Sequence, residues 1–181
     1  MPYAPPPELG DLTLDQIATL VAERKLPPLD QWAPAGEGDS RMRIAGDGTW
    51  FHDGGKITRP AMIRAFASLL TRDAAGAHWL MTPHEKLSIA VEDAAFIAVD
   101  LVQTGGGLAF RLNTDDLVIA GPEHALTARG TADAPAIYLA VRHGTEARLN
   151  RSTWAQLAEI MLAGDGASVT SQGVRFALVP Q

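Results

Sequence analysis

The sequence contains no cysteine and no long apolar run. Without cysteine there are no disulfide bonds, thiolate zinc sites or thiol nucleophiles, so a metal ion would need histidine or carboxylate ligands. No segment approaches the roughly 18 apolar residues of a membrane-spanning helix, and the first ten residues lack a basic and then apolar signal region. We therefore expect a cytoplasmic protein that has no membrane contact, and we predict no cofactor and no metal.

Positive charge is also in short supply. The chain has 15 Lys and Arg against 21 Asp and Glu, a net charge of −6. Binding to a nucleic-acid backbone depends on clustered positive charge, so bulk nucleic-acid binding is disfavoured. The balance is uneven, because residues 1–40 carry two basic and seven acidic side chains whereas residues 41–92 carry seven and five. Residues 41–92 are thus the part of the chain best suited to bind a small anion.

Residues 1–40 are predicted to form an N-terminal arm around a single helix. Thr13 and Gln16 have the spacing of a capping box, and the apolar positions from Leu14 to Val21 lie on one helical face. The helix cannot continue through Pro27 and the proline that follows it. We expect the apolar face of this helix to pack on the body of the protein.

The body alternates short strands with two helices. Several segments have an apolar residue at every second position, for example Leu87 to Val91 and Leu108 to Leu112, which predicts antiparallel sheets or a partial barrel with one wet face. Helices are expected at about residues 60–70 and 152–162, each with several apolar residues on one face. The fold class predicted is α+β.

Two parts of the chain resemble each other. Ile57-Thr58-Arg59 and Leu149-Asn150-Arg151 both follow a strand and begin a predicted helix. This similarity predicts a duplicated β-β-α-β-β unit at about 41–92 and 126–178, because such a unit buries its apolar face well against its twin. We accordingly expect an N-terminal lobe at 41–76 and a C-terminal lobe at 77–181.

The two matched arginines are the first candidate binding residues. If Arg59 and Arg151 face one cleft, their guanidinium groups and the helix amides favour a phosphate or carboxylate. The alternative is that each arginine simply pairs with a neighbouring acid. Trp50, His52 and Lys56 precede Arg59 and are suited to hold a base and a phosphate, although core packing explains Trp50 equally well.

The remaining polar residues give weaker evidence for a metal site or a binding site. None of the five histidines has the helical spacing of a zinc site. Asn113, Asp116 and His124 flank a short strand and are candidate rim residues of a site, although such clusters mostly form turns.

Over about residues 28–162, the sequence resembles a bacterial family known as domain of unknown function 1285. The resemblance lies in the order of many small motifs. The motifs are Asp47-Gly48-Thr49-Trp50-Phe51-His52, Ile57 with Arg59, Leu80-Met81-Thr82-Pro83-His84-Glu85-Lys86, Val91-Glu92-Asp93-Ala94, Asn113-Thr114, Gly121-Pro122-Glu123-His124 and Asn150-Arg151. The sequence departs from the family pattern at Ala125, where the family has Pro, and at Asp115, where it usually has Gly.

The resemblance implies two α+β domains with repeated motifs, of which the C-terminal one is superficially similar to a pleckstrin-homology fold. It also implies a nucleotide-like ligand at the domain interface and a role in signalling. By this similarity the residues near the interface are Trp50, His52, Arg59, Thr82, Glu85, Lys86, Asn113 and Arg151.

Three functions follow as hypotheses. The main expectation is a non-catalytic sensor or adaptor that holds a small anionic, nucleotide-like ligand between its lobes. A hydrolase acting on a phosphoester, with Glu85 as base and His52 or His84 beside it, is an alternative. The other alternative is a protein-interaction module that recruits a partner through a sheet edge or the acidic arm.

Overall fold

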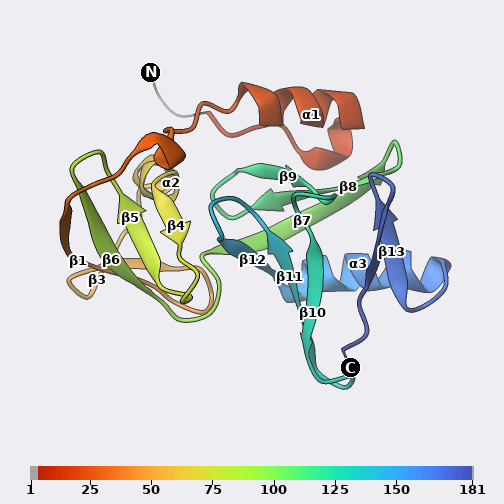
Figure 1. The fold of residues 1–181 in the computed structure, drawn as a ribbon. Coiled ribbons are helices and arrows are strands. Elements are labelled where there is room, and N and C mark those ends of the chain that lie inside the picture. Colours follow the sequence, from red (N-terminus) through yellow and green to blue (C-terminus); the bar gives the residue numbers. More distant parts are fainter. Residues whose placement is uncertain (1–3, 181) are drawn as a thin grey trace.

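The computed structural model describes residues 4–180, which form two lobes and an arm that lies across them (Figure 1). Each lobe is built on one six-stranded sheet. The first sheet consists of β1 (Gly36–Ile44), β2 (Trp50–His52), β3 (Gly55–Lys56), β4 (Leu70–Arg72), β5 (His78–Met81) and β6 (Glu85–Val91). The second consists of β7 (Phe96–Thr104), β8 (Gly107–Leu112), β9 (Leu117–Ile119), β10 (Leu126–Gly130), β11 (Pro135–Ala140) and β12 (Glu146–Leu149).

The two sheets have the same strand order. The first runs β3-β2-β1-β6-β5-β4, and the second, read from β9, runs β9-β8-β7-β12-β11-β10. In each sheet the first and sixth strands pair in parallel at the centre, and antiparallel strands flank them on both sides. The α+β fold with two duplicated lobes is therefore confirmed. The sheets are mixed, however, where purely antiparallel sheets were expected.

The repeat in the sheets differs from the predicted pairing of residues 41–92 with 126–178. The predicted local order does exist, because β1 to β3 and β10 to β12 are each followed by a helix and a hairpin. After α2 (Pro60–Ala67), however, the chain returns through β6 to pair with β1. After α3 (Arg151–Ala163) it forms the separate ribbon of β13 (Ser168–Ser171) and β14 (Val174–Ala177). The lobes thus divide between β6 and β7, not after residue 76.

Two helices belong to the lobes. α2 (Pro60–Ala67) starts with the proline in its first turn, where its missing N–H leaves no hydrogen bond unmade. α3 (Arg151–Ala163) starts at Asn150, whose side chain accepts a hydrogen bond from the Thr153 N–H at 2.8 Å. The second sheet is open, with β9 and β10 at its edges, and α3 follows its last strand. The likeness of this lobe to a pleckstrin-homology fold stays a prediction.

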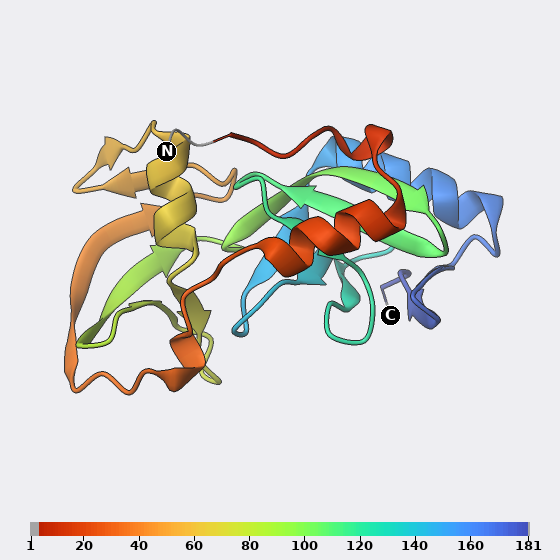
Figure 2. The ribbon, with the colours of Figure 1, turned by 90° about the horizontal axis from the view of Figure 1, so that it is seen from above.

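The arm contains a short turn of 3-10 helix at Leu9–Asp11, α1 (Leu14–Glu23) and a second such turn at Leu29–Gln31. The predicted capping box is confirmed, because Thr13 and Gln16 each accept a hydrogen bond from the other's backbone N–H. Figure 2 shows α1 lying across the second lobe, and its contacts are with β8 and β9. Leu9 and Ile17 are fully buried there. The arm is therefore part of the folded body, as the apolar face of its helix predicted.

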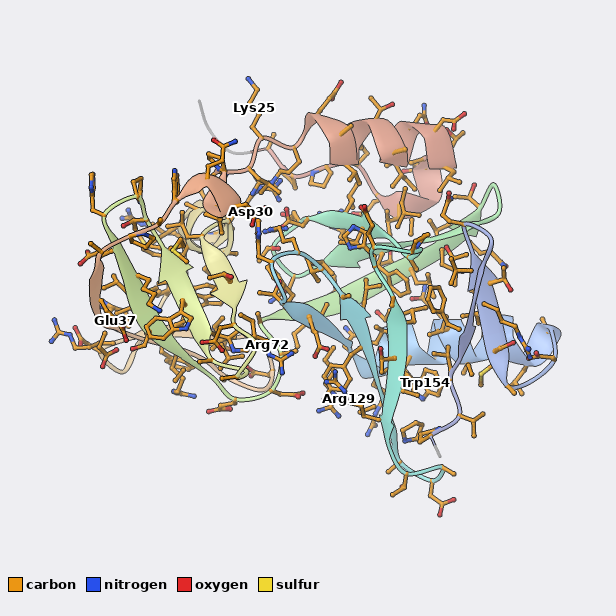
Figure 3. All side chains as sticks on the ribbon, in the orientation of Figure 1. Lys25, Asp30, Glu37, Arg72, Arg129 and Trp154 are labelled. Carbon is orange, nitrogen blue, oxygen red and sulfur yellow. The ribbon has the colours of Figure 1, made fainter. Side chains whose placement is uncertain are left out.

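The lobes also touch each other directly. The Arg72 N–H at the end of β4 donates to the carbonyl oxygen of His143, which lies in the turn between β11 and β12, at 2.9 Å. Gly144 follows with a φ of +78°, and a Cβ at this position would lie 2.5 Å from the Arg72 carbonyl oxygen. Arg72 is seen between the lobes in Figure 3. Glycine at 144 therefore allows the turn of one lobe to approach the backbone of the other.

None of the helices formed by residues 4–180 combines the length and the apolar character that crossing a membrane requires.

Candidate anion-binding site

Asp116 is a buried carboxylate at the junction of the arm and the two lobes. It lies in the turn between β8 and β9, and its side chain is only 4% exposed. The preceding residue, Asp115, has a φ of +64°, a conformation that aspartate tolerates better than most side chains. The Thr114 hydroxyl donates to Asp116 Oδ2 at 2.7 Å. This turn therefore directs a carboxylate inward.

Three arginines surround this carboxylate, and each comes from a different part of the molecule. Arg24 follows α1 and donates from Nε to Oδ1 at 3.1 Å. Arg142 follows β11 and places Nη2 at 3.4 Å from Oδ2, and Arg64 on α2 places Nη1 at 3.9 Å from Oδ1. Asp116 therefore joins the arm, the first lobe and the second lobe, because each of them places a guanidinium group beside its carboxylate.

The pKa values of Asp116 and Arg142 are shifted by burial and by the charges around them. Burial alone would raise the pKa of Asp116, but Arg142, the Thr114 hydroxyl, Arg24 and Arg64 together hold it below its ordinary value. The pKa of Arg142 is lowered, first by burial and further by the nearby Arg24 and Arg64, although Asp116 opposes the shift. Asp116 is thus ionised at neutral pH.

Backbone carbonyl groups accept further hydrogen bonds from the arginines. Arg64 Nη1 donates to the Thr114 carbonyl oxygen at 2.7 Å, and Arg24 Nη1 donates to that of Lys25 at 3.1 Å. Arg142 Nη2 also lies 3.4 Å from the carbonyl oxygen of Ala67, the last residue of α2, where the helix dipole is negative. These contacts fix the position of the three guanidinium groups.

Some N–H donors of the cluster remain. Within residues 4–180, Arg24 Nη2 and Arg142 Nη1 have no hydrogen-bond acceptor, and Arg142 Nε is buried without one. Buried donors normally have a partner, because an unpaired one loses its hydration without compensation. Arg24 Nη2 and Arg142 Nη1, which are not among the buried atoms, are therefore able to donate hydrogen bonds to a further acceptor group.

A pocket of about 490 Å³ opens beside the cluster. One wall is formed by the arm and the other by the two lobes. The arm contributes Ala4, Pro6, Leu20, Val21, Glu23, Arg24, Lys25 and Leu26, and the lobes contribute Arg64, Asp115, Asp116, Leu117, Val118, His124, Val141 and Arg142. The Lys25 side chain extends outward, away from the lobes (Figure 3). The site therefore combines an apolar lining with a positively charged end.

Of the residues expected at a site, Asp116 and His124 line this pocket. His124 is held by a contact of 2.9 Å between its Nδ1 and the carbonyl oxygen of Ala140. Trp50 and Lys56 line a separate cavity of about 300 Å³. Trp50 is only 1% exposed and stacks on Phe66 with the ring centroids 6.5 Å apart, as its interpretation as a core residue predicted.

Five further residues of the expected site have local contacts elsewhere. The Thr82 hydroxyl donates to the carbonyl oxygen of Glu85 at 2.8 Å, and so closes the turn before β6, where the Glu85 side chain is exposed. Asn113 Oδ1 accepts from the Ile97 N–H at 3.0 Å. Two more residues are near opposite charges or rings: Lys86 Nζ lies 4.2 Å from the Trp79 ring centroid, and His52 Nε2 lies 3.5 Å from Asp53 Oδ2.

Arg59 and Arg151 are both exposed, and neither is among the residues that line the pocket at Asp116. Each lies at the start of a helix, one in each lobe, as predicted. The structure therefore gathers a different set of arginines at the junction: Arg24, Arg64 and Arg142.

Sequence reasoning missed these three residues as a group. In the sequence, Arg24 is a favourable positive charge near the end of its helix, and Arg142 alternates with apolar residues of a strand, as on a wet sheet face. The only local signal was Asp116 within an Asn-Thr-Asp-Asp turn. Nothing in the sequence indicates that segments 92 and 26 residues from Asp116 converge on it. Within the described residues 4–180, no group of three or more histidine or acidic side chains is placed to hold a metal ion.

The fold and the junction define a two-lobed α+β protein with a repeated six-stranded sheet. The chain belongs to the DUF1285 family, a family of unknown function, whose N-terminal domain matches residues 27–94 and whose C-terminal domain matches residues 95–178. Both matches place the division between the lobes where the sheets divide.

Two solved structures are similar to the chain. A DUF1285 family protein from Silicibacter pomeroyi DSS-3 is 35% identical, with a TM-score of 0.77 over 91% of this chain and 94% of that one. A DUF1285 family protein from Shewanella baltica OS155 is 24% identical, with a TM-score of 0.54 over 65% of this chain and 90% of that one, and supports the fold alone. No curated protein matches the chain.

Proposed function

We propose that the protein is a non-catalytic receptor for a small anionic ligand, which binds in the pocket beside Asp116. The observation that carries this proposal is the convergence of Arg24, Arg64 and Arg142 on one carboxylate at the end of a pocket. Arg24 Nη2 and Arg142 Nη1 have no acceptor within residues 4–180. Charge-assisted hydrogen bonds from guanidinium groups to phosphate or carboxylate are among the stronger ones in proteins, so these two donors favour an anion.

The location of the pocket supports a role as sensor or adaptor in bacterial signalling. Its walls come from the arm and both lobes, so a ligand would contact all three parts at once. A ligand that binds one arrangement of these parts more tightly than another shifts the population toward it. The phosphate of a nucleotide-like ligand, which the family resemblance implies, would meet the same arginines.

The proposal is tested by thermal unfolding with inorganic phosphate, pyrophosphate and AMP at constant ionic strength. Binding to the native state alone raises the melting temperature, by several degrees when the ligand exceeds its dissociation constant about a hundredfold. The variants Arg24→Gln and Arg142→Gln should lose most of this rise. The exposed Arg59→Gln and Arg151→Gln are matched controls, because they remove the same charge outside the pocket, and they should keep it.

The result that contradicts the proposal is a rise that survives in Arg24→Gln and Arg142→Gln but disappears in the two controls. Such a result would place the site at the helix starts. The absence of any rise with all three compounds in the wild-type protein would also overturn it.

A further inference from the structure

The pocket beside Asp116 is charged at one end and aliphatic over much of the rest, and this division indicates what kind of ligand would fit it. Its charged end contains the three arginines with Asp115 and Asp116, and the arm adds Glu23 and Lys25. Most of the remaining wall is aliphatic. The aliphatic lining consists of Leu20, Val21 and Leu26 on the arm and Leu117, Val118 and Val141 on the second lobe. Neither wall contains a phenylalanine, tyrosine or tryptophan among the described residues, and His124 is the single ring.

Two of these side chains are exposed to water. Val21 is 37% exposed and Leu26 is 38% exposed, although large apolar side chains are more often buried. Both lie on the arm next to Arg24, so apolar surface and positive charge occur side by side at one pocket. A ligand that covers Val21 and Leu26 gains free energy in proportion to the apolar area removed from water.

We infer that the ligand of this pocket is an amphiphilic anion, with a phosphate or carboxylate head at Arg24 and Arg142 and an aliphatic body along Val21 and Leu26. The inference rests on the proposed function, because it requires an anion at the arginines. The body of a nucleotide fits this lining less well, since bases are held largely by stacking on aromatic rings, and His124 is the one aromatic ring that residues 4–180 contribute to the pocket.

The experiment measures dissociation constants by isothermal titration calorimetry for inorganic phosphate and for butyl, hexyl and octyl phosphate, all below their micelle concentrations. Affinity should rise about fourfold for each methylene group that becomes buried, until the chain extends beyond the pocket. AMP supplies the same head with a nucleoside body and should bind more weakly than hexyl phosphate.

Two substitutions in the pocket lining test whether the gain in affinity per methylene group comes from this pocket. Val21→Thr keeps the shape of the side chain and adds a hydroxyl group, and Leu26→Gln keeps a similar length. Both should reduce the gain in affinity per methylene, measured relative to each variant's own affinity for inorganic phosphate. Leu162→Gln is the control, because Leu162 is 71% exposed on α3 outside the pocket, and it should change neither quantity.

The outcomes separate the inference from the proposed function. If inorganic phosphate binds but chain length has no effect, or if AMP binds more tightly than hexyl phosphate, the inference is overturned and the anion receptor stands. If none of the phosphate compounds binds, the anion receptor itself fails, and the inference fails with it.

Discussion

Arg24 Nε donates to Asp116 Oδ1 at 3.1 Å, across 92 residues of sequence. Arg24 lies just before the segment that matches the family's N-terminal domain, and Asp116 lies within the C-terminal domain. The contact therefore makes the arm one wall of the pocket at the junction. The side chain of Asp116 is 4% exposed and that of Arg24 is 24% exposed, so this ion pair is far less screened by water than a surface pair.

Asp116→Asn should destabilise the protein. The substitution leaves three guanidinium groups together without their carboxylate, and breaking a buried ion pair typically costs about 3–5 kcal/mol. We expect the lower end of that range, because the arginines keep 15–24% of their side-chain surface exposed. Urea unfolding measures the difference. The exposed Asp133→Asn should change the free energy of unfolding by no more than about 0.5 kcal/mol, and an equal loss in both variants would refute the assignment.

Gly144→Ala tests the close approach of the lobes. Gly144 and Gly166 share a φ of +78°, but a Cβ at 144 would lie 2.5 Å from the Arg72 carbonyl oxygen, whereas one at 166 would meet nothing within 4 Å. Gly166→Ala should therefore cost about 1 kcal/mol for the backbone conformation alone. Gly144→Ala should cost a further ~1–3 kcal/mol for the steric overlap. Chemical denaturation of both variants measures this, and equal losses would show that the lobes do not meet at this turn.

Ile17→Ala tests the docking of the arm. Ile17 is fully buried in a small cluster with Leu9 and Ala109, and removing the larger part of such a side chain costs about 2–5 kcal/mol. The arm should then open more often, so trypsin should cleave faster after Arg24 and Lys25 in native buffer. Leu162→Ala, at an exposed position, provides the comparison. Equal cleavage rates in Ile17→Ala and the wild type would mean that the α1 contact does not hold the arm.

The stability of the first lobe should depend on the protonation of His78. Burial lowers the pKa of His78, and Arg72 lowers it further, against the opposing influence of Glu146 and Asp73. The folded state therefore binds this proton less readily than the unfolded state, whose pKa is near 6.5. Stability is full above that value and is lost as the pH falls through it toward the folded pKa.

Urea midpoints at pH 7.5 and pH 5.5 measure this effect. The decrease in midpoint on acidification should be smaller in His78→Gln than in the wild type. A decrease that is unchanged or larger in the variant would contradict the direction of the pKa shift.

Local patterns in the sequence predicted the elements well. The capping box at Thr13, the apolar face of its helix and the period of two in β8 each depend on interactions between near neighbours. The parallel pairing of β1 with β6 could not be predicted from these local patterns. Parallel pairing joins segments that are distant in the sequence, so no tight turn between them marks it. The sequence therefore predicted a repeated β-β-α-β-β unit, whereas the unit that the structure repeats is a six-stranded sheet.

The same distinction applies to the site. Asp116 was a candidate because its turn is visible in the sequence, but its partners come from three separate segments. Arg111 and Arg142 occupy positions that alternate with apolar residues, which predicted a wet face. In the folded chain the side chains of both are at most 15% exposed, because the arm and the first lobe cover them. Arginines that are paired by tertiary contacts cannot be told from solvated ones by spacing alone.

The most direct test of the account is X-ray diffraction from crystals soaked in tungstate, a dense tetrahedral dianion whose anomalous signal locates it without ambiguity. The account predicts a tungsten peak within hydrogen-bond distance of Arg24 and Arg142, beside Asp116, and the loss of that peak in Arg142→Gln. A peak at Arg59 or Arg151 with none beside Asp116 would contradict it.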